Sequence, residues 1–161
     1  MGRPLDIGYF KKQKTKDRAS VAKKRTVLNK ICAWNLDKEY YDGKRINGYA
    51  GFKYDGRWKK ILPKIIKRYR LTRKSRVLDL GCKKGFLLKD LNILIPGIKT
   101  FGIENHSYPL KKAVKCKSKL ILSEYNKLPF KNKYFDFVIA FNSLYMQHLG
   151  DVIKSLKEIE R

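Results

Sequence analysis

The sequence predicts an α/β fold, with a parallel sheet and flanking helices, in the second half of the chain. There, short apolar runs typical of buried strands alternate with segments whose apolar residues recur at helical spacing. Strands separated by short helices favour a parallel sheet with helices on its faces. With 43% hydrophobic and 12% aromatic residues, the composition is that of a folded globular protein.

Four strands are expected in this part, each an apolar run beside a turn signal. They are RVLDL at 76–80, KTFGIE at 99–104, KLILS at 119–123 and FDFVIAF at 135–141. A helix is expected from Phe86 to Ile95, where Pro96 and Gly97 end it. Ser107 is expected to cap a second helix through residues 108–115, and Asp151 to open a third.

Residues 1–75 are expected to form a separate, basic N-terminal extension, followed by the sheet domain at 76–161. The extension begins with apolar residues at helical spacing, namely Val21, Leu28, Ile31 and Trp34. Glycines then alternate with aromatic residues over 40–58, which indicates turns whose aromatic side chains pack. The alternative is that Tyr49, Tyr54 and Trp58 line an acceptor cleft or stack on bases. A helix with Pro63 in its first turns leads into the sheet domain.

The net charge of +25 is spread unevenly. Residues 1–76 hold 24 Lys and Arg against 6 Asp and Glu, and residues 77–161 hold 15 against 8. Such asymmetry favours a polyanionic partner, RNA or a phosphorylated substrate, near the N-terminal half. The alternative is a lysine-rich surface that is simply solvated, because the lysines are dispersed rather than gathered in one block.

Other features of the sequence exclude several classes of protein. No apolar run approaches the roughly 18 residues of a membrane span, and the N-terminus lacks the apolar core of a signal peptide. Cys32, Cys82 and Cys116 lack the spacing of metal ligands and fit reduced thiols, so we expect a cytoplasmic protein without a metal site.

The turn after the first strand carries the strongest functional signal. In a parallel sheet, ligands bind beyond the carboxyl ends of the strands, which is where Gly81 to Gly85 lie. Gly81 permits a sharp turn, and Gly85 lets the next helix start close to the strand. Glu104 closes the second strand, 25 residues after Asp79, and is placed to accept hydrogen bonds from two ribose hydroxyls.

The spacing of this turn separates two classes of cofactor. A nicotinamide dinucleotide site would need glycines at positions 83 and 86, where the chain has Lys83 and Phe86. The run Asp79-x-Gly81-x-Lys83-x-Gly85 instead resembles the D/E-x-G-x-G-x-G loop of class I S-adenosylmethionine-dependent methyltransferases.

Four further segments resemble the same family, in the same order. Glu104 in FGIEN matches the acid that ends the second strand, and SEYNKLPF matches a segment whose acid, here Glu124, faces the adenine amino group. YFDFVIAF is similar to the family's fourth strand, and LKEIER to its following helix. The resemblance implies a Rossmann-like fold, S-adenosylmethionine as cofactor and transfer of a methyl group to an acceptor that the sequence does not identify.

The resemblance also implies a set of site residues. The cofactor-binding residues would be Asp79, Gly81, Lys83, Gly85, Glu104, Glu124, Tyr125 and Asn142. For catalysis, His148 and Asn142 are the candidates near the acceptor, and neither is assigned a role. The family's sheet has the order 3-2-1-4-5-7-6, of which only 3-2-1-4 is visible, so we expect an incomplete sheet and a fragment or truncated chain. The alternative is that another segment, such as the N-terminal 75 residues, or another subunit covers the open edge of the fourth strand.

The main departure from the family is Lys83, which stands where the loop has its middle glycine. If the backbone there has positive φ, Lys83 would cost on the order of 1 kcal/mol of strain. Its ammonium would also repel a sulfonium cation. Two other functions therefore stay open: a basic RNA-binding protein that uses the methyltransferase fold, and an inactive homologue that serves as an interaction module.

Overall fold

A computed structural model describes residues 21, 23–145 and 147–161 of the chain. These residues form two compact units, which meet between Asp55 and Gly56.

The N-terminal unit contains two short helices, each begun by a side-chain cap. Helix α2 spans Val27–Trp34, and its capping box pairs Thr26 with Asn29 through side-chain and backbone hydrogen bonds. Helix α3 spans Lys38–Asp42, and the Asp37 carboxylate accepts hydrogen bonds from the first backbone N–H groups.

The glycine- and aromatic-rich segment of this unit is a packed loop. The rings of Tyr40, Tyr41, Tyr49 and Phe52 lie with centroids 4.5–6.0 Å apart, and Tyr41 is only 1% exposed. Gly48 is required because a Cβ there would collide with the Tyr40 backbone. The aromatic residues at 40–52 therefore pack on one another, as the pattern predicts.

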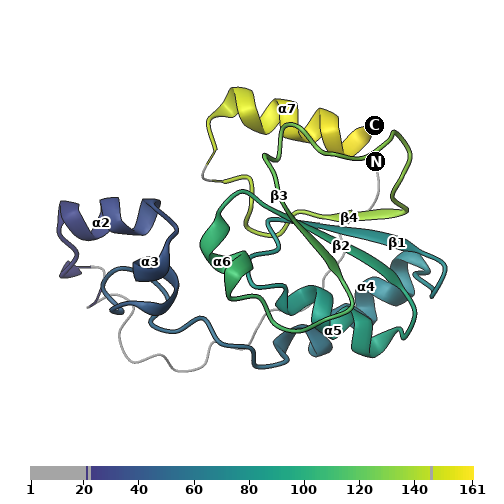
Figure 1. Ribbon diagram of the computed structural model, residues 1–161, viewed down its shortest axis with the longest axis horizontal. Helices are drawn as coiled ribbons and strands as arrows, with labels where there is room; N and C mark the ends of the chain where they lie inside the picture. Colours follow the sequence, from purple (N-terminus) through teal and green to yellow (C-terminus); the bar gives the residue numbers. More distant parts are fainter. Residues whose placement is uncertain (1–20, 22, 146) are drawn as a thin grey trace. The chain divides into compact units, whose positions relative to one another are not determined.

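The second unit is built on a four-stranded parallel sheet with the order β3-β2-β1-β4 (Figure 1). The strands are β1 at Arg76–Leu80, β2 at Lys99–Glu104, β3 at Lys119–Leu122 and β4 at Phe137–Ile139. The predicted parallel α/β sheet and its 3-2-1-4 order are confirmed. Strand β4 is shorter than the apolar run predicts, because pairing with β1 extends only over Val77 to Asp79.

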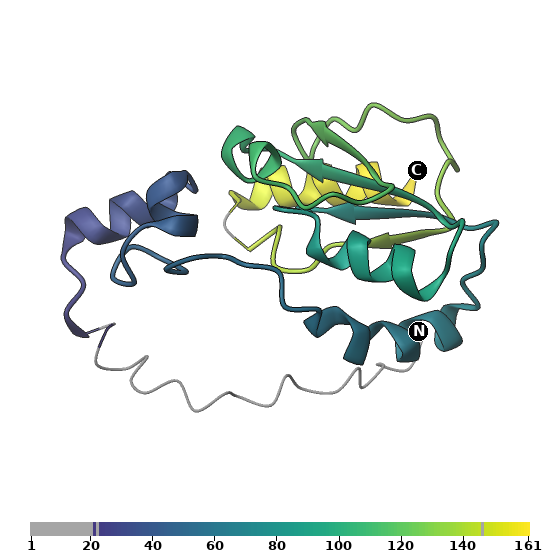
Figure 2. The same cartoon turned by 60° about the horizontal axis from the view of Figure 1, so that its bottom comes forward.

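Helices cover both faces of this sheet. The 3₁₀ helix η1 (Arg57–Lys60), α4 (Leu62–Tyr69) and α5 (Phe86–Leu94) lie on one face, and α7 (Leu149–Glu160) lies on the other (Figures 1 and 2). The fifth helix of this unit, α6 (Ser107–Lys111), contacts β2 and β3. Pro63 lies in the first turn of α4, where its missing N–H costs no hydrogen bond.

The alternation of side chains along β1 builds a core on each face. Leu78 and Leu80 pack with Ile103 and, from α7, Ile159. Val77 is fully buried as well, and α5 contributes Leu88 and Leu91 to the buried interior. Apolar burial at about 25 cal/mol per Å² is the main force that holds the helices to the sheet.

Several boundaries differ from the sequence prediction. His106, not Ser107, is the N-cap of α6, and this helix ends at Lys111 rather than near residue 115. Helix α7 begins at Leu149, two residues before Asp151. The sheet unit begins at Gly56 rather than after residue 75, because η1 and α4 pack against α5.

Candidate functional site

The turn between β1 and α5 is tied to the end of β2. The backbone N–H groups of Gly81 and Cys82 both donate to the carbonyl of Ile103, at 2.8 and 3.0 Å. Gly81 has φ +82° and Gly85 has φ +75°, which is a left-handed conformation that glycine adopts without strain. Both glycines are therefore needed for the path of the backbone.

Lys83 also has positive φ, at +52°. For a residue with a Cβ this conformation costs about 1 kcal/mol. The sequence predicted strain at Lys83 if φ were positive, and φ is positive. The Lys83 backbone N–H donates to Oε2 of Glu104 at 3.0 Å, and this bond holds the strained residue in place. The lysine side chain itself is half-buried.

Glu104 is the centre of the site. Its side chain is buried, with the residue only 2% exposed, and it accepts hydrogen bonds from three different loops. Lys83 N–H binds Oε2, while Oε1 accepts from the backbone N–H groups of Asn105 and His106 at 3.0 and 3.2 Å and from the Tyr125 hydroxyl at 3.2 Å. A buried carboxylate needs such partners, because desolvation of an unpaired charge is costly.

Tyr125 and Ser143 fill the space above Gly81. A Cβ added to Gly81 would collide with Cβ of Ser143 and would lie 3.3 Å from the Tyr125 hydroxyl oxygen. Tyr125 is 5% exposed, and Oγ of Ser143 is buried without a hydrogen-bond partner among the described residues. Sequence reasoning missed Ser143, whose one signal is its place directly after Asn142 beyond the fourth strand.

The electrostatics of the site are dominated by two enclosed carboxyl groups. Burial raises the pKa of Asp79 to about 7; the charge of Lys83 opposes this rise and that of Glu104 adds to it. Asp79 is therefore about half protonated near neutral pH. Burial, the charge of Glu104 and its hydrogen bond also raise the pKa of Tyr125, which stays a hydrogen-bond donor.

The structure places the other candidate residues at the surface. Glu124 is exposed beside the buried Tyr125, and Asn142 is exposed at a bend with φ +54°. His148 is exposed at the N-cap of α7, where its carbonyl accepts the N–H groups of Asp151 and Val152. Six candidates lie around the turn: Asp79, Gly81, Lys83, Gly85, Glu104 and Tyr125.

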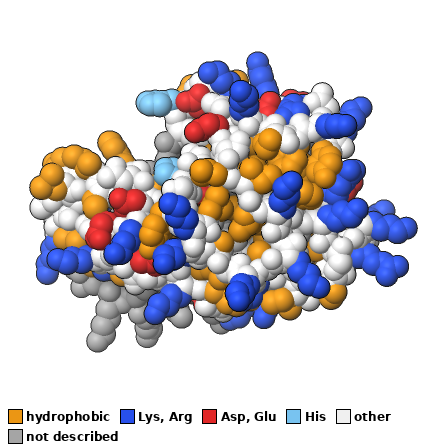
Figure 3. Space-filling view, in the orientation of Figure 1, with side chains coloured by type: hydrophobic (Ala, Val, Ile, Leu, Met, Phe, Trp, Pro, Cys, Tyr) orange, Lys and Arg blue, Asp and Glu red, His pale blue; other side chains and the backbone are white. Residues whose placement is uncertain are grey.

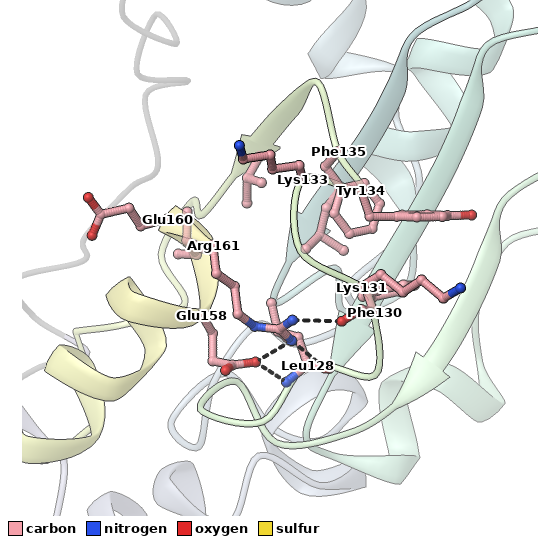
Figure 4. A pocket seen from close by; sticks show the side chains of 12 residues that line it. Leu128, Phe130, Lys131, Lys133, Tyr134, Phe135, Glu158, Glu160 and Arg161 are labelled. Carbon is pink, nitrogen blue, oxygen red and sulfur yellow. Dashed lines mark hydrogen bonds and ion pairs between the residues drawn. The ribbon is translucent and has the colours of Figure 1, made fainter.

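Two cavities lie elsewhere in the sheet unit. One of about 200 Å³ lies between α7 and residues 128–135, where the Arg161 guanidinium donates to the carbonyls of Leu128 and Phe130 and to Glu158 (Figure 4). The other, of about 410 Å³, is lined by the end of α5 and by residues 115–117. Gly81, Glu104 and Tyr125 line neither cavity.

A parallel sheet that carries an acid and a glycine turn at its carboxyl ends defines the class of nucleotide-binding α/β proteins. Within that class, the sequence model of the methyltransferase domain family matches residues 78–161, just over half of the chain. The chain therefore belongs to this methyltransferase domain family, and the resemblance seen in its motifs is confirmed.

Individual relatives agree with this family. The chain is 32% identical over 90 residues to a malonyl-[acyl-carrier protein] O-methyltransferase of Legionella pneumophila, a match that covers 52% of this chain and 32% of that protein. The chain thus spans about a third of the length of this curated relative.

Solved structures show the same fold. A protein of Anabaena variabilis described as a methyltransferase from an antibiotic biosynthesis pathway shares 22% identity at a TM-score of 0.56, over 63% of this chain and 40% of that one. An S-adenosylmethionine-dependent methyltransferase of Aquifex aeolicus shares 24% identity at a TM-score of 0.52, over 68% and 67% of the two chains. An amino pentose methyltransferase of Micromonospora echinaspora, solved with S-adenosylmethionine, shares 21% at 0.52, over 63% and 45%.

Proposed function

We propose that this chain is an S-adenosylmethionine-dependent methyltransferase, or the cofactor-binding part of one. The family supports this proposal, and the observation that carries it is the buried Glu104 carboxylate at the carboxyl end of β2. A charged group is retained there at a cost in desolvation, which is typical of a binding site.

The residues of the turn fit this cofactor. Glu104 is an acceptor-only group, which suits the two hydroxyls of a ribose. Gly81 has no Cβ to hold a ligand away from the backbone. Cβ of Ser143 lies directly against it, and the buried hydroxyl of Ser143 has no hydrogen-bond partner among the described residues. When bound, S-adenosylmethionine supplies an activated methyl group on a sulfonium sulfur.

The chain's own residues would mainly bind and orient. We propose that Glu104 holds the ribose and that the backbone of Gly81 and Gly85 accommodates the methionine side, with Lys83 N–H fixing the carboxylate. A half-protonated Asp79 limits the negative charge at the turn. The proposed cofactor-binding set stays Asp79, Gly81, Lys83, Gly85, Glu104, Glu124, Tyr125 and Asn142, with His148 and Asn142 as candidates near the acceptor.

Binding of S-adenosylhomocysteine, measured by calorimetry, tests this proposal. Glu104→Gln keeps the shape of the side chain but replaces one acceptor by a donor that faces backbone N–H groups. Since hydrogen bonds to charged groups contribute about 1.5–3 kcal/mol, we expect affinity to fall at least tenfold. Glu160→Gln, at an exposed position on α7, is the matched control and leaves affinity unchanged. A chain that binds no cofactor at all would instead be the inactive homologue.

We propose as a second property that the segment from η1 to β1 contacts a polyanion, with RNA as the partner. Residues 57–74 hold nine Lys and Arg and no Asp or Glu, and all nine are exposed. Figure 3 shows Lys and Arg side chains spread over the face in view. Like charges one helical turn apart repel one another, and phosphates would relieve that repulsion.

Binding to single-stranded RNA over a salt series tests this second property. Replacement of Lys60, Lys64 and Lys67 by glutamine should weaken binding and flatten its dependence on salt. The same change at three exposed lysines elsewhere, Lys115, Lys117 and Lys119, is the control of equal charge. Equal losses in the two triple variants would show a general charge effect without a defined surface.

A cytoplasmic location is also part of the proposal, supported by three free cysteines. Among the residues that the structure describes, no helix is long and apolar enough to cross a membrane. The same residues hold no group of three or more His, Cys, Asp or Glu side chains arranged for a metal ion.

A further inference from the structure

The protein itself already occupies one oxygen of the Glu104 carboxylate. Oε1 accepts hydrogen bonds from the backbone N–H groups of Asn105 and His106 and from the Tyr125 hydroxyl, and Nδ1 of His106 lies 3.4 Å from it. Oε2 accepts from the Lys83 N–H. Each carboxylate oxygen offers about two lone-pair sites, so Oε1 is full whereas Oε2 keeps one site. A ribose whose two hydroxyls bind the two oxygens must therefore displace a donor from Oε1.

Tyr125 is the donor that can leave. The three N–H groups belong to the backbone of two segments. One is the turn after β1, where Gly81 and Cys82 donate to the Ile103 carbonyl of β2, and the other is the loop that directly follows β2. The Tyr125 hydroxyl, by contrast, stands at the end of a side chain, and rotation about the Cα–Cβ bond moves it without any change in the backbone. The hydroxyl oxygen also lies 3.3 Å from the position that a Cβ on Gly81 would take. The Tyr125 side chain therefore covers both Glu104 and Gly81.

Ser143 closes the same space from the loop after β4. Its Cβ would collide with a Cβ on Gly81, and its buried Oγ has no hydrogen-bond partner among the described residues. An unsatisfied buried hydroxyl disfavours the closed arrangement, because it has lost water and gained no partner. Displacement of Tyr125 would give this hydroxyl access to water or to a ligand.

We propose that Tyr125 and Ser143 form a latch that closes the site in the ligand-free chain and opens when a ribose displaces the Tyr125 hydroxyl from Glu104. This inference rests on the proposed function, since it concerns the same site. The latch lowers the apparent affinity by the fraction of molecules in which it is open. Removing the hydroxyl of Tyr125 raises that fraction without touching Glu104.

Calorimetric titration of Tyr125→Phe with S-adenosylhomocysteine tests the latch. Phenylalanine keeps the ring that packs with Ile103 and Leu128, so the fold is retained, which circular dichroism checks. We expect binding about tenfold tighter than for the unaltered chain, the effect of one hydrogen bond to a charged group. Tyr134→Phe removes the same atom from the aromatic cluster around Phe130 and is the matched control, with affinity unchanged.

A second measurement follows the latch directly. In protein labelled with ¹³C at the tyrosine ζ carbon, the Tyr125 resonance, assigned by its loss in Tyr125→Phe, should shift on saturation with S-adenosylhomocysteine. Ser143→Ala removes the unpaired hydroxyl that destabilises the closed state. The closed state then becomes more populated, and affinity for S-adenosylhomocysteine should fall severalfold. Unchanged affinity in Ser143→Ala would remove Ser143 from the latch.

The outcomes separate the latch from the function on which it rests. If the unaltered chain binds and Tyr125→Phe binds equally or more weakly, then Tyr125 is not a latch, while the cofactor site stands. Binding by Tyr125→Phe alone would support both. If neither protein binds, the proposed function fails and the latch with it.

Discussion

Two places in the sheet unit treat enclosed charge in opposite ways. At the carboxyl ends of β1 and β2, Asp79 and Glu104 are like charges, 4% and 2% exposed, and the pKa of Asp79 is raised to about 7. Between α7 and residues 128–133, opposite charges pair: Arg161 and Glu158 lie 2.8 Å apart, and the hydrogen bond from Arg161 lowers the pKa of Glu158.

This difference distinguishes a binding site from a structural contact. The Arg161 contact ties α7 to the loop after β3 with half-buried charges that compensate each other. The Glu104 site also ties loops together, yet it keeps two carboxyl groups in the interior and a strained Lys83 beside them. Buried carboxyl groups and backbone strain lower the stability of the fold. Residues that are kept in such an unfavourable arrangement are typical of functional sites.

The largest expected effect is the pH dependence that Asp79 confers. The folded chain holds this proton up to about pH 7, whereas the unfolded chain releases it near 3.8. The resulting stabilisation is fully present below pH 3.8 and is lost as the pH rises through 7, by up to about 4 kcal/mol. Urea unfolding from pH 5 to pH 8 should show a fall in stability that Asp79→Asn abolishes. An equal slope in the variant would contradict the raised pKa.

Loss of the Glu104 carboxylate should have the next largest effect. Glu104→Ala leaves three backbone N–H groups and the Tyr125 hydroxyl without their acceptor, and we expect the free energy of unfolding to fall by about 3 kcal/mol. Urea denaturation measures this change, with Glu160→Ala as the exposed control. A loss no larger than that of the control would show that Glu104 does not tie the three loops together.

The Arg161 contact should respond more weakly, since both charges stay partly exposed to water. Arg161→Ala removes the bonds to Leu128, Phe130 and Glu158, and we expect a loss of about 1.5 kcal/mol. Thermal unfolding compares this variant with Arg68→Ala, an exposed arginine on α4. A loss as large as that of Glu104→Ala would erase the contrast between the two places.

The smallest effect is a gain. Lys83→Gly relieves the strain of positive φ and should stabilise the chain by about 1 kcal/mol, while the backbone N–H still holds Glu104. Affinity for S-adenosylmethionine should hold or rise, because an ammonium group that would repel the sulfonium cation is removed. Much weaker binding by the glycine variant in calorimetry would mean that the Lys83 side chain contacts the ligand.

Much of the fold and part of the site follow from local patterns. The bounds of β1 and β2 match their apolar runs, because a buried strand needs apolar residues that follow one another in the sequence. Glu104 was predicted as a site residue from its place at the end of β2. The cap of α6 at His106 and the start of α7 at Leu149 were not predicted, because helix ends depend on neighbouring loops.

What the sequence by itself determined is the parallel α/β sheet, since apolar periodicity and turn glycines act within short stretches of chain. Its motifs also indicated the family, and the strand order followed from that resemblance. The tertiary structure alone decided that the Tyr125 hydroxyl binds Glu104, that Ser143 covers Gly81, and that α4 belongs with the sheet unit. Each of these brings together residues from separate loops or elements. Their contacts depend on packing and on competition for one carboxylate, which no local pattern encodes.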